Sequence, residues 1–140
     1  MTAKDIKNMA LACGACKLIE EANTIAELVA LMGTPQGREF CKVNSFPSID
    51  ILREHKEELA TLNVFVDAGK IELTDVDNAI IAGETTAVIR TKSVDKPYHA
   101  MVMHGAKAKV IAYGYSVCQV VNIGGKVECN KSTNASIFIM

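Results

Sequence analysis

The sequence predicts an α+β protein in which short N-terminal helices cap a C-terminal right-handed β-helix-like solenoid. Residues 3–60 carry helix caps and apolar residues at helical spacing, which indicate several short helices. Residues 64–140 repeat one unit four times: apolar alternation, a glycine, then apolar alternation again. The central glycines are Gly69, Gly83, Gly105 and Gly124. Their steps of 14, 22 and 19 residues suit a stack of strand rungs, so we expect a helical cap over 1–62 and a solenoid over 63–140.

Composition limits the class of protein. The chain has 140 residues, enough for one compact unit with a helical cap, and a core of Ala, Val, Ile, Leu and Met, because only 5% of residues are aromatic. A net charge of −1 argues against nucleic acid as a partner. No apolar run is long enough to span a bilayer and residues 1–16 lack a signal-peptide layout, so we expect no membrane contact and a cytoplasmic location.

Four helices are expected before residue 63, and the first three begin at a recognisable cap. Thr2 and Thr24 are each followed three residues later by an acidic residue, which is the capping-box pattern. Thr34 precedes Pro35, which suits the first helical position. A last, highly charged helix is expected over residues 49–59. The first helix should present one apolar face formed by Ile6, Met9, Cys13, Cys16 and Ile19.

Alternation within each repeat predicts which strand residues face the interior. The residues expected to face inward are Val64, Val66, Ile71, Leu73, Ala87, Ile89, Ala106, Ala108, Val110, Val127 and Cys129. The alternative fold is a small antiparallel β-roll or sandwich, in which the glycines would form hairpin turns.

Cys13 and Cys16 form a CxxC pair, which is typical of a redox site or of half a zinc site. The pair is expected within the first helix, on the same apolar face as Met9, and no second pair follows. We therefore predict that these thiols pack in the core and that the protein uses no metal and no cofactor. The odd total of five cysteines fits reduced thiols.

His104 is the histidine with the strongest case for a functional role. It precedes Gly105 at an expected rung corner, where glycine allows close approach of a ligand. In-register stacking would align Asp67 with Ile81, Met103 and Asn122, one residue away from His104. A small enzyme using His104 with Asp67, or using His99, is therefore an alternative, although no nucleophile is evident and a structural histidine is the simpler interpretation.

Basic residues recur on the outward arms of the repeats and could form a ladder, because stacked rungs lie about 4.8 Å apart. These residues are Lys70, Arg90, Lys107, Lys109 and Lys126. Such a ladder would attract a small anionic ligand or a protein partner, whereas Glu72, Glu84 and Glu128 favour an ordinary solvated face. The candidate ligand-binding residues are His104, Lys107, Lys109, Arg90, Tyr113 and Tyr115.

The last expected strand, over residues 135–139, is apolar and lies at one end of the stack. An exposed strand edge is a template for further strands, so we expect this end to be buried against a second subunit in a homo-oligomer.

Two stretches carry a resemblance to a known group of proteins. Residues 34–41 (TPQGREFC) with the following 44–47, and residues 103–108 (MHGAKA), resemble segments of small uncharacterised proteins of gut bacteria, their prophages and mobile elements. That family has no assigned activity, and small proteins in this context are often binders. The resemblance implies a non-enzymatic binding protein, with an inhibitor of bacterial defence as one subtype. A virion or assembly module is the alternative.

Overall fold

The computed structural model describes residues 1–15 and 17–140, with helices in the first part of the chain and strands in the second. The helices are α1 (Ala3–Ala12), the 3₁₀-helix η1 (Lys17–Glu21), α2 (Ile25–Met32), α3 (Pro35–Asn44), α4 (Ile49–Glu54) and α5 (Lys56–Ala60). The strands are β1 (Val64–Val66), β2 (Gly69–Thr74), β3 (Ala79–Ala82), β4 (Thr85–Thr91), β5 (Tyr98–Met103), β6 (Lys107–Ala112), β7 (Val117–Ile123), β8 (Lys126–Lys131) and β9 (Ser136–Ile139). No helix in this described part is long and apolar enough to cross a membrane.

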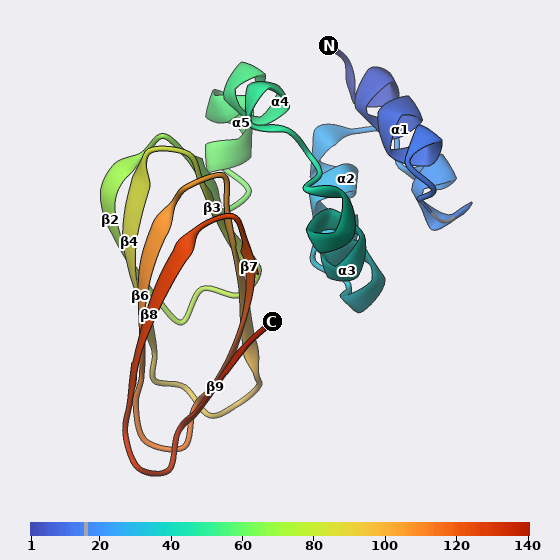
Figure 1. Ribbon diagram of the computed structural model, residues 1–140. Helices are drawn as coiled ribbons and strands as arrows, with labels where there is room; N and C mark the ends of the chain where they lie inside the picture. The colour runs from blue at the N-terminus through green and yellow to red at the C-terminus, as the bar shows by residue number, and fades with distance from the viewer. Residues whose placement is uncertain (16) are drawn as a thin grey trace.

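The strands form two parallel sheets, because each strand pairs with the second strand after it in the chain. The odd sheet has the order β1-β3-β5-β7-β9 and the even sheet the order β2-β4-β6-β8, and every ladder between these strands is parallel. The chain therefore winds alternately through the two sheets as a β-solenoid of about four turns (Figure 1). The predicted fold class is confirmed, and the antiparallel roll or sandwich is excluded.

The register gives the length of each turn. Val64 aligns with Ile80, Ile80 with Met101, and Met101 with Val121, so successive turns take 16, 21 and 20 residues. The glycine steps predicted these lengths closely, but the glycines are not all equivalent. Gly69 aligns with Thr85 and not with Gly83, because the first corner carries Asp67 where the second carries Gly83.

Two hydrophobic cores lie on either side of the odd sheet. The inner core fills the space between the sheets and consists of Ile81, Ala87, Ile89, Ala100, Val102, Ala106, Ala108, Val110, Cys118 and Val120. The outer core joins the helices to the other face of the odd sheet, through Ile51, Leu52 and Leu59 on the helical side and Ile80, Met101, Met103 and Val121 on the strand side. The helices accordingly lie along one side of the solenoid (Figure 1), and do more than close its first turn.

Burial confirms the predicted alternation in β4 and β6 of the even sheet. Ala108 and Val110 are buried while Lys107 and Lys109 are exposed, as expected. On β8, Cys129 was predicted to face inward but is exposed, because no other described strand pairs with the far edge of β8.

Burial also corrects the prediction in β1. Val64 and Val66, however, belong to the outer core, and the residue between them, Phe65, packs against the inner core. The helices bury the face of β1 that alternation alone would assign to the interior.

The first helix ends earlier than its apolar spacing predicts. Thr2 forms the expected capping box with Asp5, but α1 stops at Ala12 and Cys13 is its C-cap. Cys13 is exposed, so its predicted packing in the core is wrong. The reason is that Gly14 adopts a φ of 93°, which turns the chain out of the helix. Cys16 lies outside the described residues.

Candidate functional site

One corner of the solenoid forms a column of residues in the left-handed backbone region. Asp67, Gly83 and His104 directly follow the aligned strand ends and have φ values of 49°, 66° and 52°. Gly124 continues the column with a φ of 78°. The predicted alignment of Asp67 with Ile81, Met103 and Asn122 is therefore wrong, and His104 itself belongs to this column, which we call the corner column.

Asp67 joins the first corner to helix α4. Its carboxylate accepts hydrogen bonds from Arg53 Nε at 2.7 Å and from the backbone N–H of Glu84 at 2.7 Å. Lys56 Nζ also donates to the backbone carbonyl of Asp67 at 3.2 Å. The hydrogen bond from Arg53, together with that from Glu84, lowers the pKa of Asp67 below its usual value. This carboxylate is thus held ionised between a helix and a solenoid turn.

His104 joins the third corner to the segment between α3 and α4. Its Nε2 lies 2.7 Å from the backbone oxygen of Pro47, and the ring nitrogen must donate because a carbonyl only accepts. Gly83 occupies the corner between Asp67 and His104, so these two side chains are one turn further apart than neighbours in the column. Asp67 contacts Arg53 of α4, whereas His104 contacts Pro47 in the segment before α4. The arrangement suits attachment of the helices and does not bring an acid and a base together.

His99 lies at the start of β5, beside Asp77. The Asp77 carboxylate accepts from the His99 backbone N–H at 2.9 Å, and His99 Nδ1 lies 3.3 Å from the same oxygen. Burial disfavours the charged carboxylate, but the hydrogen bonds from His99 and from the Asn78 backbone N–H together outweigh it and lower the pKa of Asp77. Among the described residues no group of three His, Cys, Asp or Glu side chains could hold a metal ion.

The predicted basic ladder divides into three columns on the outer face of the even sheet. Lys70 aligns with Thr86, then with Lys107 and Lys126. Lys109 stands in the next column, between Val88 and Glu128. Arg90 stands in a third column and pairs diagonally with Glu72 at 3.3 Å. Only Lys107 and Lys126 are direct basic neighbours, so the positive charge is local.

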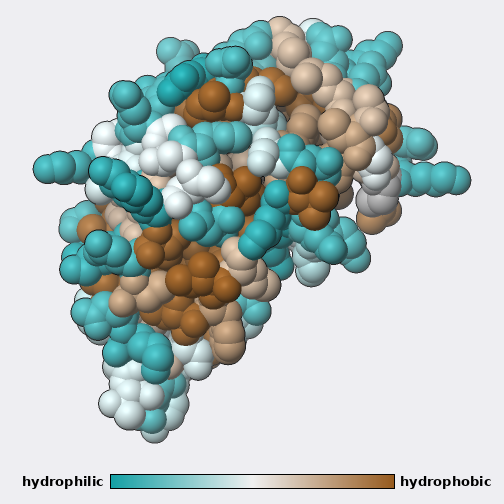
Figure 2. Space-filling model, in the orientation of Figure 1, coloured by the Kyte–Doolittle hydropathy of each residue, from teal (hydrophilic) through white to brown (hydrophobic). Residues whose placement is uncertain are grey.

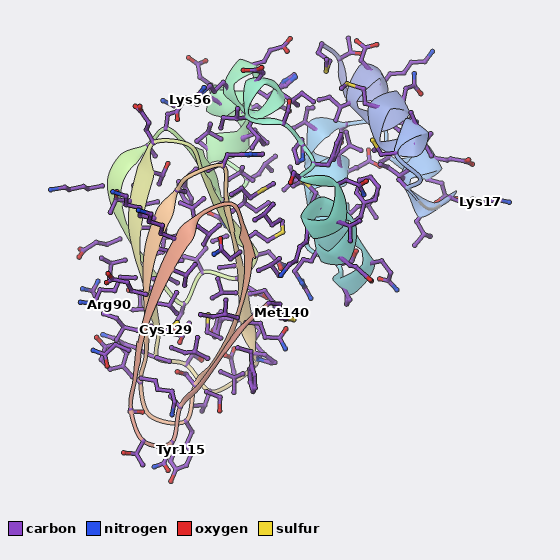
Figure 3. All side chains as sticks on the ribbon, in the orientation of Figure 1. Lys17, Lys56, Arg90, Tyr115, Cys129 and Met140 are labelled. Carbon is purple, nitrogen blue, oxygen red and sulfur yellow. The ribbon has the colours of Figure 1, made fainter. Side chains whose placement is uncertain are left out.

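The two tyrosines lie at the opposite corner from His104. Lys92 Nζ stands 5.4 Å from the centre of the Tyr113 ring. Tyr115 is 71% exposed at the tip of the solenoid, and Figure 3 shows it well apart from Arg90. Of the six candidate residues, Arg90 and Tyr113 lie side by side, because the Tyr113 hydroxyl makes the largest contribution to the raised pKa of Arg90. His104 lies at the helical junction, Lys107 and Lys109 lie on the even sheet, and Tyr115 lies at the far corner.

The last strands of the two sheets, β8 and β9, leave one end of the inner core open. Val127 and Ile137 are half-buried against that core, whereas Phe138, Ile139 and Met140 are 53%, 50% and 49% exposed. Figure 2 shows hydrophobic atoms gathered between the two sheets at this end. We call these five residues the open end. It matches the exposed apolar strand that the sequence predicts.

A groove of about 460 Å³ in the helical half was not predicted from the sequence. It is lined mainly by apolar side chains from η1, α2 and α3. Sequence spacing does not reveal it, because the groove forms only when helices that are separate in the chain pack side by side. The one available signal was Val43, an apolar residue among polar neighbours on α3.

Comparison with known proteins adds nothing to these geometric observations. No protein-family model, no curated protein and no solved structure matches the chain.

Proposed function

We propose that the chain is a non-enzymatic binding protein that associates through the open end of its solenoid, in the first place with a second copy of itself. The observation that carries this proposal is the combination of exposed apolar side chains with a free strand edge at β9. Its resemblance to small proteins of prophages and mobile elements, among which binders are common, agrees with this function.

The backbone of β9 has hydrogen-bonding groups to offer. Ser136 donates its N–H to Ser116, and Met140 both donates to Val120 and accepts from Asn122. Backbone groups of successive residues in a strand point to opposite edges. The N–H and C=O groups of Ile137 and Ile139 therefore face away from β7, where no other described strand pairs with them.

The two strands at the open end differ in how they are protected. Lys126, Glu128 and Lys131 place charges along β8, which is the usual way to block edge pairing. Strand β9 reads SIFI and carries no charge. An uncharged, apolar edge of four residues is self-complementary in the antiparallel direction, so a two-fold dimer through β9 satisfies its backbone and covers Phe138.

Sedimentation of the wild-type protein and two matched variants tests this proposal. At about 0.1 mM protein we expect a homodimer, and Phe138→Lys should convert it to monomer because a lysine on the edge blocks pairing. Tyr115→Lys, also an exposed aromatic residue but at the far corner, should remain a dimer. A monomeric wild-type protein would contradict self-association, and loss of the dimer in Tyr115→Lys alone would move the interface to that corner.

A further inference from the structure

We propose that the helical half binds a small, uncharged apolar molecule in the groove between η1 and the α2–α3 pair. The residues that define this helical groove are Leu18, Ile19, Leu31, Phe40, Val43 and Phe46. Its volume of about 460 Å³ lies within the range of about 300–1,000 Å³ typical of small-molecule sites and is too small for a folded partner. This inference goes beyond the proposed function, because the groove is separate from the open end.

The groove is deep, since its floor is part of the outer core. Ile6, Leu28 and Cys41 line it and are 6%, 8% and 1% exposed. Its rim is exposed to solvent, since the side chains of Leu18 and Val43 are 63% and 75% exposed. A ligand seated on the floor would therefore contact the outer core and remove these two rim side chains from water, which is the main source of affinity for an apolar molecule.

Two aromatic rings form one wall of the groove. The rings of Phe40 and Phe46 meet edge to face, with centres 5.6 Å apart and planes at 66°. Phe46 precedes Pro47, whose carbonyl accepts the hydrogen bond from His104. This hydrogen bond joins the Phe46–Pro47 wall to the solenoid corner through a contact outside the groove.

The chemistry of the lining selects against charged ligands. Glu39 is the one charged side chain among the described lining residues, so no cation is present to hold an acidic head group. The Cys41 thiol on the floor stays neutral because burial raises its pKa to about 12. The Thr34 hydroxyl already donates to the Leu31 carbonyl at 2.7 Å. These features favour a neutral molecule with few polar groups.

Titration of the full chain with the neutral dye Nile red, followed by fluorescence, tests the inference. We expect saturable binding of one dye per chain with a blue-shifted emission. Val43→Glu should weaken binding by about tenfold or more, because a carboxylate would enter the rim of an apolar site. The matched control is Val94→Glu, because Val94 is 66% exposed in a solenoid loop away from the groove. This variant should bind the dye as the wild type does.

Two further variants make the result decisive. Leu18→Glu changes the opposite rim and should also weaken binding, while the high exposure of Leu18 leaves the fold unaffected. Phe138→Lys blocks the open end and should leave the dye affinity unchanged, whatever its effect on the oligomeric state. The inference is overturned if the wild type shows no saturable binding, or if Phe138→Lys abolishes binding while Val43→Glu does not.

Discussion

The helical half and the solenoid differ in how each buries its apolar residues. Each solenoid turn packs on the turns before and after it, and the inner core lies wholly between strands. The helices are short, and their apolar residues are buried mainly against the odd sheet and against one another. Helices of 5 to 10 residues are marginal alone in water. We therefore expect the helices to depend on the solenoid more than the solenoid depends on the helices.

The attachment between the two halves uses polar contacts as well as the outer core. Arg53 binds Asp67 at the first corner, and Pro47 accepts from His104 at the third corner. Both corner residues adopt positive φ values that cost free energy for residues other than glycine. Asp tolerates this region better than most residues, and both side chains are oriented toward the helices from it. The corner column thus serves the solenoid and the attachment at once.

The largest expected effect is the loss of folding when a charge is placed in a core, and it should differ between the inner and the outer core. Ile81→Asp puts a carboxylate into the inner core, where Ile81 is fully buried, and should abolish folding of both halves. Leu52→Asp, equally buried but in the outer core, should release the helices and leave the strands folded. Amide hydrogen exchange distinguishes the outcomes. Loss of strand protection in Leu52→Asp would show that the solenoid depends on its helices.

A smaller effect is expected at the corner column. A Cβ on Gly83 would lie 2.2 Å from the Asp67 carboxylate, and Gly83 has a φ of 66°. Gly83→Ala should lower the free energy of unfolding by about 3 kcal/mol, through backbone strain and a lost charge-assisted hydrogen bond. Gly69→Ala has a similar φ of 69° but open space around the new Cβ, so it should cost only about 1 kcal/mol. Equal losses in chemical denaturation would argue against the Asp67 contact.

The smallest effect is a pH dependence of the attachment. The pKa of Asp67 is lowered in the folded protein, so its contribution is present above the ordinary carboxyl pKa and is lost as pH falls through the lowered value. Because the pair with Arg53 is partly exposed, this contribution should be about 1 kcal/mol or less.

Asp67→Asn is the matched variant, since asparagine tolerates positive φ and cannot ionise. Thermal denaturation of both proteins from neutral pH to about pH 3 should show the wild type losing more stability than Asp67→Asn. Parallel curves would mean that the carboxylate does not act through its charge.

The repeats predicted the winding of the solenoid and the two faces of β4 and β6, but not the face of β1 that the helices bury. The repeats of residues 64–140 predicted parallel turns, and alternation in KAKVIA predicted correctly that Lys107 and Lys109 are exposed. Strands β3 and β5 of the odd sheet contain the apolar runs AIIA and AMVM, which indicate burial on both faces. That signal was available for β3 and β5. Strand β1 has only three residues, VFV, which is too short a run to show whether Val64 or Phe65 faces the inner core.

The candidate site was predicted less well, for a related reason. The exposed apolar strand β9 was predicted, over residues 135–139, because a short local pattern is enough to indicate it. The basic residues were assigned to one ladder, but turns of 16 and 21 residues shift Arg90 and Lys109 into separate columns. The helical groove was missed altogether, since its walls come from segments that meet only after packing.

Local chemistry predicted a solenoid, because alternating aliphatic residues and turn residues recur at near-regular steps. The parallel register of the strands then excluded the antiparallel roll, which the sequence alone left open. Caps such as Thr2, Thr24 and Thr34 were likewise readable, because a hydroxyl bonds an amide three residues away. Folding in three dimensions decided where the helices lie, that His104 binds a helical linker, and that a groove remains between η1 and α3. Those outcomes depend on which surfaces bury the most apolar area together, and no local pattern records that competition.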